Sequence, residues 1–463
     1  MKNLFKKIVI PLICTFTVVS CTKSNIPPPT PLEENPPQAV LTTVKWKTPT
    51  GNGNGGIGNY NLSPTVTDDN NTVIVPNQNG KVFAIDIDNG SVKWQENTEV
   101  KISSQPNTIA NAVVFGSIKG DLIALDTDNG QTLWKTTAPS SLFSRPTIYD
   151  NSVYVYTHDG SISAYNAINS EQLWTEPNIL PDLILPGNSS PIVLNNTVMI
   201  GSSYGTILGF TVDDGDRTIN IPIAISQGSS PADRMVDIVS TPLLYGDYLI
   251  FSAYQGAIVG IDKDKGKMLW AKKASIINNI EINDNAIFTT QADSSIKAYD
   301  ITTGDILWTQ DILKWRDVTS PIYYKGMIVV GDYEGYLHFF NSINGQYLGR
   351  LRLTTPEDAY FTKGIKGELI PTEKGIVVEA DNGDTYLVEA GSDAVIYTTI
   401  LSDHVLDKGK SVSHIDPIVI ESDEEESTEI ISSGSSPKTT APAKNVNVII
   451  ADLSPQKVNN EQN

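Results

Sequence analysis

Residues 84–94 read AIDIDNGSVKW, and the pattern Ala-x-Asp-x3-Gly-x3-Trp inside this stretch returns along the chain. Further copies begin at Ala124 and Ala298, and looser ones begin at Gly260 and Ala164. A period near 40 residues indicates one small structural unit that is copied many times. Because such a unit packs only on its neighbours, the sequence predicts a repeat architecture.

Each copy reads as four short strands joined by tight turns. A proline such as Pro64 marks the first strand, where no ladder donor is lost, and a β-branched run such as Val73-Ile74-Val75 marks the second. Asn79-Gly80 and Asn89-Gly90 are dipeptides that tolerate the positive φ of a hairpin turn. The repeat is therefore predicted to be a four-stranded antiparallel meander.

The number of copies follows from the residue that ends the first hairpin of each copy. It occurs at eight positions, which are Gly80, Gly120, Gly160, Gly205, Gly256, Ser294, Gly335 and Gly383. Five copies carry a tryptophan 14 residues later, at Trp94, Trp134, Trp174, Trp270 and Trp308. Ile219, Gly349 and Tyr397 stand at this place in the fourth, seventh and eighth copies. We expect the indole to pack between adjacent blades rather than to bind a ligand.

One further copy of the tryptophan strand stands alone near the N-terminus. Val44-Lys45-Trp46 echoes Val92-Lys93-Trp94, although no Ala-x-Asp strand precedes it. Such an outer strand can pair into the last blade and remove the free edge of the ring. We therefore predict an all-β chain with an eight-bladed β-propeller of four-stranded antiparallel blades over residues 41–401, the ring being closed by the strand around Trp46.

The first 20 residues read as a lipoprotein signal peptide. Three lysines precede an apolar stretch, residues 8–19, that is too short to span a membrane. The run from Val18 to Cys21 resembles the lipobox of bacterial lipoproteins, which implies cleavage before Cys21 and lipidation (palmitate) of this residue. Thr22 then implies the outer membrane, with the protein facing the periplasm. The alternative is an ordinary secretory signal with a chance cysteine.

Composition describes the two flanks and excludes some partners. Residues 21–40 are rich in proline and read as a flexible membrane tether, and residues 402–463 read as a disordered acidic, Ser/Pro-rich tail. The chain carries 33 Lys+Arg against 53 Asp+Glu, so its formal net charge is −20. This balance argues against nucleic acid and anionic lipid as partners. Cys14 and Cys21 are the two cysteines, so the mature protein has no disulfide.

The repeated pattern resembles the blade motif of quinoprotein dehydrogenases and their relatives. Within that superfamily the chain is most similar to the family of the outer-membrane protein assembly factor BamB, on the stretches GIGN at 56–59, RMVD at 234–237 and VGDYEGYLH at 330–338. The resemblance covers about residues 40–390 together with the signal. It implies a non-catalytic scaffold lipoprotein that binds periplasmic domains of the BamA insertase and assists insertion of outer-membrane proteins. We expect a monomeric propeller with no cofactor.

The family contact surface lies on two loops, and the resemblance carries it over to specific residues. Its Leu-x-Leu-Arg-Gly pattern reads LILPG at 183–187, with Pro186 in place of the arginine. Its Arg-x-x-Asp-x-Asp pattern reads RMVDIV at 234–239, with Val239 in place of the second acid. The implied partner-binding residues are Leu183, Leu185, Gly187, Arg234 and Asp237. The apolar part of the contact is kept, while its electrostatic part is reduced.

The repeat spacing selects the same two loops. Before the seventh copy, the two longest spacings are 45 residues, ending at Gly205, and 51 residues, ending at Gly256, and the added length falls in residues 175–189 and 217–239. Long loops on a rigid scaffold are where binding residues concentrate. The aliphatic residues of the first loop could also pack over the rim of a blade, and this alternative remains open.

Two other function classes compete with a scaffold: a quinone-dependent dehydrogenase and a polysaccharide-binding envelope propeller. The repeated aspartates are Asp86, Asp126, Asp262 and Asp300. They occupy equivalent places in different blades, so we expect them to cap turns rather than to meet at one metal ion. The histidines are His158, His338, His404 and His414, and none has the spacing of a metal ligand. We predict that the chain is not an enzyme and holds no metal.

Three aromatic residues bear on the polysaccharide alternative. Trp315, Tyr323 and Tyr324 could stack on sugars around the funnel of the ring, or they could belong to its core. The sequence does not separate these two roles.

Overall fold

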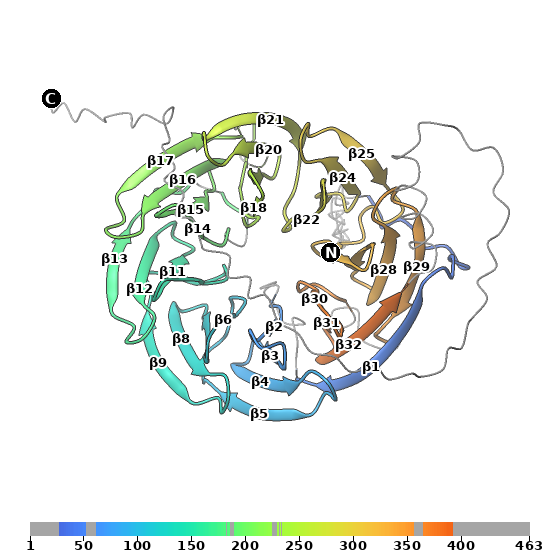
Figure 1. Cartoon of the computed structure of the whole chain (residues 1–463), viewed down its shortest axis with the longest axis horizontal. Helices are drawn as coiled ribbons and strands as arrows, with labels where there is room; N and C mark the ends of the chain where they lie inside the picture. The colour runs from blue at the N-terminus through green and yellow to red at the C-terminus, as the bar shows by residue number, and fades with distance from the viewer. Residues whose placement is uncertain are drawn as a thin grey trace, which may run out of the picture.

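Eight four-stranded antiparallel sheets stand around a central axis in the computed structural model, as the ribbon in Figure 1 shows. The structure describes residues 27–51, 62–181, 183–185, 189–224, 229–230, 232, 234–355 and 364–391. These residues form strands and no helix long and apolar enough to cross a membrane. The prediction of an eight-bladed β-propeller is confirmed.

The blades follow one another in chain order, each built from its inner to its outer strand. Blade 1 consists of β2 (Thr65–Val66), β3 (Thr72–Pro76), β4 (Lys81–Asp86) and β5 (Val92–Asn97), and blade 2 consists of β6 (Asn107–Ile109), β7 (Ala112–Gly116), β8 (Asp121–Asp126) and β9 (Thr132–Thr137). Blade 3 consists of β10 (Thr147–Tyr149), β11 (Ser152–Tyr156), β12 (Ile162–Asn166) and β13 (Gln172–Glu176). Blade 4 consists of β14 (Ile192–Leu194), β15 (Thr197–Gly201), β16 (Thr206–Thr211) and β17 (Arg217–Pro222). Blade 5 consists of β18 (Leu243–Tyr245), β19 (Tyr248–Ser252), β20 (Gly256–Asp262) and β21 (Lys267–Ala274). Blade 6 consists of β22 (Glu281–Asn283), β23 (Ala286–Thr290), β24 (Ile296–Asp300) and β25 (Ile306–Gln310). Blade 7 consists of β26 (Ile322–Tyr324), β27 (Met327–Gly331), β28 (Tyr336–Asn341) and β29 (Tyr347–Arg352). Blade 8 consists of β30 (Ile370–Thr372), β31 (Gly375–Glu379), β32 (Asp384–Gly391) and β1 (Leu41–Pro49).

The ring closes where the N-terminal strand β1 pairs with β32, side by side in Figure 1. Trp46 lies opposite Leu387 in this ladder, and its Nε1 donates a hydrogen bond to the Ile87 carbonyl of blade 1 at 2.7 Å. The strand around Trp46 therefore closes the ring as predicted. Trp46 also takes the indole position of blade 8, which the sequence spacing had assigned to Tyr397; that residue lies outside the described residues.

The tryptophans of the outer strands pack between blades, as expected. Each indole N–H donates to the carbonyl of the residue that follows the third strand of the next blade: Trp94 to Thr127, Trp134 to Ala167, Trp174 to Val212, Trp270 to Ile301 and Trp308 to Ser342, at 2.7–3.0 Å. The turn glycine of that next blade lies against the ring, and a Cβ at Gly130 would approach Trp94 within 2.6 Å. A larger residue at Gly130 would therefore displace the indole.

The repeated aspartate caps the second hairpin of its blade. Asp86 Oδ1 accepts hydrogen bonds from the N–H groups of Asp88 and Asn89, at 3.1 and 3.3 Å, and Asp126, Asp262 and Asp300 do the same in their blades. Because the strands are antiparallel, first hairpins such as that at Gly80 and second hairpins such as that at Gly90 lie at opposite ends of the strands. We call the two sides of the ring the first-hairpin face and the second-hairpin face.

Among the described residues, two of the eight blade interfaces lack an indole. Between blades 7 and 8 the position belongs to Gly349, and the chain itself covers it: a Cβ at Gly349 would lie 2.7 Å from the Pro37 carbonyl oxygen and 3.1 Å from Val40. Ala39 N donates to the Leu348 carbonyl at 2.9 Å. Between blades 4 and 5 the position belongs to Ile219, which leaves a cavity described below.

The end of the expected tether is held against blade 7. Besides the contacts of residues 37–40, Arg316 Nη1 donates to the Thr30 carbonyl at 3.1 Å, and Arg350 Nη2 donates to the Glu33 carbonyl at 2.7 Å. Leu32 packs against the cluster of buried apolar residues that contains Trp308. Residues 30–40 are thus extended, as the prolines suggested, but they lie on the propeller instead of forming part of a free linker.

Replacing Trp134 by alanine should lower the free energy of unfolding by about 3–5 kcal/mol, because it removes a buried side chain and its hydrogen bond to blade 3. Denaturant titration of the two proteins gives the comparison. Trp315→Ala is the matched control, since this tryptophan is 37% exposed and should change stability by less than about 1 kcal/mol. Equal losses in the two variants would contradict the interface role of the indole.

Candidate functional site

The two connections that carry the family patterns lie on one face of the ring, next to each other. We call residues 177–191, between β13 and β14, loop 3–4, and residues 223–242, between β17 and β18, loop 4–5. A Cβ at Gly160 would lie 2.8 Å from the Leu180 side chain, which places loop 3–4 over the first hairpin of blade 3. The N–H groups of Ile223 and Ala224 both point at the Gly205 carbonyl, at 2.9 and 3.1 Å. Both loops therefore belong to the first-hairpin face.

Loop 3–4 presents aliphatic side chains to solvent. Ile179 is 78% exposed and Leu183 is 45% exposed, whereas Ile184 and Leu185 are only partly exposed. Apolar residues displayed on a rim favour burial against another surface, since each large aliphatic side chain gains about 1.5–3 kcal/mol when it is fully removed from water. Leu183 can make such a contact directly, and Leu185 only in part. Gly187 lies outside the described residues.

Asp237 is buried and joins the two loops. Its side chain has no exposed area, and Oδ2 accepts a hydrogen bond from the Leu185 N–H of loop 3–4. Its own carbonyl accepts from Tyr254 N at 2.7 Å. Burial raises the pKa of Asp237, against the opposing effect of the Leu185 N–H, which favours the charged form. The sequence placed Asp237 in direct contact with a partner, whereas this geometry makes it a brace that positions Leu185.

Arg234 lies on the exposed part of loop 4–5. Two residues further along, Val236 turns inward, and Ile238 packs so closely on blade 4 that a Cβ at Gly201 would lie 2.0 Å from its side chain. Loop 4–5 is thus anchored by its buried end and displays a guanidinium at its outer end. Arginine is enriched at protein–protein interfaces, and the exposed Leu183 adds apolar area that a partner could bury.

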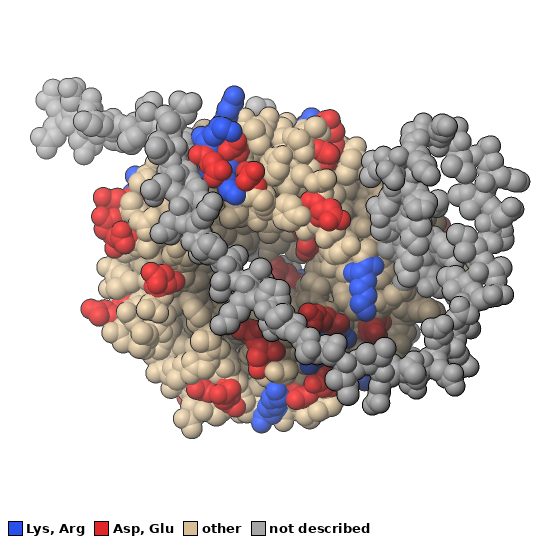
Figure 2. Space-filling view, viewed as in Figure 1, with Lys and Arg blue, Asp and Glu red and all other residues tan. Residues whose placement is uncertain are grey.

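The centre of the ring holds a polar cluster inside a cavity of about 350 Å³. Arg145 Nη2 lies 3.1 Å from Glu368 Oε2, and Asn279 Nδ2 donates to Glu368 Oε1. These residues precede blades 3, 8 and 6, so the cluster ties blades that are not neighbours. Figure 2 shows the hollow at the middle of the ring, with acidic side chains near it. Burial raises the pKa of Glu281, which also lines the cavity, to about 7.

His338 belongs to a buried network rather than to an open site. Its Nε2 lies 3.1 Å from Asp332 Oδ2, and its Nδ1 lies 3.1 Å from the Tyr347 hydroxyl. Asp332 also accepts two hydrogen bonds from the guanidinium of Arg316, at 2.7 and 2.9 Å. Burial lowers the pKa of His338 although Asp332 opposes this effect. Across the part of the chain that the structure describes, no group of three or more His, Cys, Asp or Glu could hold a metal ion.

The aromatic residues considered for sugar stacking differ in environment. Tyr324 is 4% exposed and belongs to the core of blades 7 and 8, and Tyr323 is partly buried against the apolar cluster around Trp308. Trp315 is the most exposed of the three, at 37%. They therefore form no common stacking surface.

Blade 8 contains two buried carboxyl groups at the end of β31. Glu379 and Asp381 are each 2% exposed, and their carboxylate oxygens accept no hydrogen bond from the described residues. Burial raises the pKa of Asp381 to about 7 although Lys366 Nζ lies 3.7 Å away, and burial together with Asp381 raises the pKa of Glu379. Their enclosure keeps them from a substrate, so their effect is on stability.

Asp381→Asn should make the free energy of unfolding less dependent on pH. Because the pKa of Asp381 is higher in the folded state than in the unfolded state, the unfolded chain loses this proton at lower pH. The contribution of Asp381 to the free energy of unfolding therefore falls as the pH rises from about 4 to about 7, and it is constant above that range. From pH 5 to pH 8 the wild type should lose about 2–3 kcal/mol more of its free energy of unfolding than the variant does. Urea titrations at the two pH values measure this difference, and parallel losses would contradict the burial of an acid.

A family profile and a similar protein with the same description both match this chain. A family profile described as "Outer membrane protein assembly factor BamB" matches residues 78–279 and 255–425. The chain is 63% identical over 450 residues to the outer membrane protein assembly factor BamB of Francisella tularensis subsp. tularensis, covering 96% of this chain and 98% of that protein.

Solved structures share the fold. The crystal structure of BamB from Moraxella catarrhalis matches with a TM-score of 0.67 and 23% identity, over 75% of this chain and 100% of that one. A quinohemoprotein alcohol dehydrogenase from Comamonas testosteroni matches with a TM-score of 0.59 and 13% identity, over 76% of each chain. At these identities both likenesses show the propeller alone.

Proposed function

We propose that this chain, which belongs to the family of the outer membrane protein assembly factor BamB, is a non-catalytic scaffold that docks on periplasmic domains of a BamA-like insertase and assists insertion of outer-membrane proteins. The high identity to a BamB over nearly the whole of both chains supports the assembly role. The quinohemoprotein likeness is confined to the fold, so it favours no dehydrogenase chemistry for this chain.

The observation that carries the docking surface is the pair of loops joined by Asp237. Leu183 and Ile179 are exposed on loop 3–4, and the buried carboxylate fixes the backbone of the same loop at Leu185. A preformed apolar rim gives up less conformational entropy on association than a mobile loop does. Arg234 is exposed on loop 4–5, three residues before the Asp237 that joins the two loops, and supplies a cation. The absent arginine and second acid of the family pattern, at Pro186 and Val239, leave the contact mainly apolar.

Attachment to the membrane completes the proposal. Lipidation of Cys21 would anchor the chain to the outer membrane, facing the periplasm. Thr30, whose carbonyl is bound by Arg316 of the propeller, lies only nine positions after Cys21 in the sequence. A fully extended chain advances at most about 3.6 Å per residue, so blade 7 would stay within roughly 30 Å of the lipid. The anchor thus holds the ring close to the insertase.

Leu183→Asp should weaken binding to the purified periplasmic domains of the insertase at least about tenfold, because a charge replaces an exposed apolar contact. Titration calorimetry measures the change. Ile168→Asp is the matched control: this residue is 74% exposed in a second hairpin, on the opposite face, and should leave the affinity unchanged. An unchanged affinity in Leu183→Asp would remove loop 3–4 from the contact.

Asp237→Ala should also weaken insertase binding, by roughly threefold to tenfold, although Asp237 itself is buried. The variant releases the Leu185 N–H, whose hydrogen-deuterium exchange should become faster. Asp237→Asn keeps an acceptor oxygen and should retain most of the affinity. If Asp237→Ala binds normally while Leu185 exchanges quickly, the brace is not needed for docking.

A further inference from the structure

The interface between blades 4 and 5 breaks a rule that the rest of the ring keeps. Six of the eight interfaces hold an indole, including that of Trp46, and each indole N–H donates to a backbone carbonyl of the next blade. Between blades 4 and 5 the smaller Ile219 occupies the position. Its side chain neither fills the space of an indole nor carries a hydrogen-bond donor.

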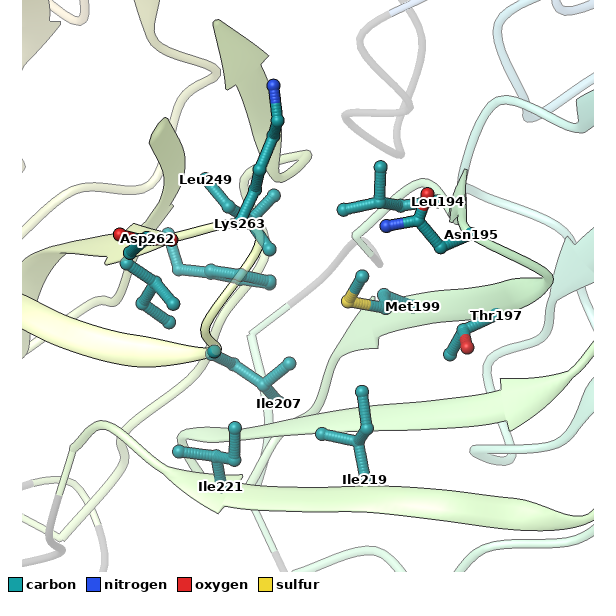
Figure 3. A pocket seen from close by; sticks show the side chains of 13 residues that line it. Leu194, Asn195, Thr197, Met199, Ile207, Ile219, Ile221, Leu249, Asp262 and Lys263 are labelled. Carbon is teal, nitrogen blue, oxygen red and sulfur yellow. The ribbon is translucent and has the colours of Figure 1, made fainter. Parts of the chain in front are cut away.

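A cavity of about 40 Å³ remains beside Ile219. Figure 3 shows Leu194 and Met199 on one wall, Leu249 and Lys263 on the other, and Ile207, Ile219 and Ile221 along the floor. The deeper residues are buried, while Asn195 and Lys263 at the rim reach solvent. A mainly apolar space of this kind forfeits dispersion contacts along its lining and favours an apolar occupant over water. We call it the blade 4–5 slot.

The slot retains the partners that an indole uses elsewhere. Lys263 follows Asp262 as Ile301 follows Asp300, so the Lys263 carbonyl holds the place of the acceptor that binds Trp270. Gly266 holds the place of the turn glycines that lie against the ring in other blades and lines the slot. Gly209, opposite Ile219, corresponds to Gly260, opposite Trp270. The backbone around the slot is therefore shaped for a ring that the chain does not supply.

The other interface without an indole shows what fills such a gap. Between blades 7 and 8, the extended residues 37–40 lie along the outer strand β29, with Ala39 N bound to the Leu348 carbonyl. Val40 comes within 3.1 Å of a Cβ at Gly349 and packs on the core of blades 7 and 8. An extended segment from outside the blade thus makes a backbone hydrogen bond to the outer strand and contributes an apolar side chain.

We propose that the blade 4–5 slot binds one aromatic side chain, an indole above all, from an extended segment of a partner polypeptide that lies along the edge of β17. β17 is the last strand of its sheet, so its outer edge presents backbone groups for strand addition. The mouth of the slot lies between the β14–β15 turn of blade 4, which contains Asn195, and the second hairpin of blade 5, which contains Gly266. Both turns are on the second-hairpin face. The slot therefore lies opposite loops 3–4 and 4–5 and is free while they dock.

Methionine methyl resonances offer a direct test, because the chain has five methionines and Met199 lines the slot. The full-length protein labelled at the methionine methyl carbon is titrated with an extended Thr/Val-rich peptide of about ten residues that carries one central tryptophan. The Met199 methyl signal should shift through the ring current of the bound indole. The same peptide with serine in place of tryptophan should cause no shift, and Met327, buried in blade 7, should not respond to either.

Ile219→Trp places an indole of the chain itself in the blade 4–5 slot. This variant should be more stable than the wild type and show a displaced Met199 signal before any peptide is added, and the peptide should then have no further effect. Leu194→Asp, which places a charge at the rim, should abolish the response if Ile219→Trp does not fold. An unmoved Met199 signal at about 1 mM peptide, or an equal response in folded Ile219→Trp, would overturn the proposal.

The loop surface can be separated from the slot in the same experiment. Leu183→Asp, which removes the proposed insertase contact, should leave the Met199 response intact. A response confined to Met235 of loop 4–5 would place the peptide on the first-hairpin face and would refute the slot. The proposal therefore stands or falls independently of insertase docking.

Discussion

The hydrogen bond from an outer-strand indole to the next blade is the contact on which the ring depends. Each four-stranded sheet has two apolar faces, and it can bury them only against its two neighbours. The indole covers a large area of that interface, and its N–H binds a carbonyl at the end of a strand, where the ladder no longer provides a partner. Six of the eight interfaces repeat this directional contact, and β1 with Trp46 provides the one that joins the last blade to the first.

The sequence predicted this architecture because its determinants are local. Hairpin dipeptides such as Asn89-Gly90 specify the turn by backbone conformation alone. The 14 residues from Gly80 to Trp94 leave room for two short strands joined by such a turn, so the spacing predicts consecutive antiparallel strands. Closure was predictable since Val44-Lys45-Trp46 repeats an outer strand without its blade. The role of Asp237 was not, because a loop aspartate ordinarily faces water, and the Leu185 N–H that holds it inside lies 52 residues away in the sequence. Likewise, nothing in a proline-rich stretch indicates that Ala39 pairs with β29.

Buried charges determine how the N-terminal segment is held. Arg316 binds Asp332 and Glu334 through its guanidinium and also reaches the Thr30 carbonyl. Removing such an ion from water is unfavourable unless its hydrogen bonds are satisfied, and Asp332 in turn binds His338. The network therefore fixes the position of Arg316, and with it the path of residues 30–40 along blade 7. A membrane anchor upstream of this segment would act on a rigid part of the ring rather than on a free linker.

Blade 4 and its neighbour are where the repeat departs from its own rule on both faces. On the first-hairpin face the connections lengthen, and Val236 and Ile238 of loop 4–5 pack into the interface from that side. On the second-hairpin face Ile219 replaces the indole and leaves the slot. Loop packing from one side accounts for how this interface holds together without a tryptophan, and the same buried end anchors the rim that displays Arg234. Local rules in proteins are broken most often where function requires it, and here both departures meet in one interface. Both proposed binding surfaces therefore lie where the sequence departs from the repeat, and the regular copies of the repeat form the scaffold.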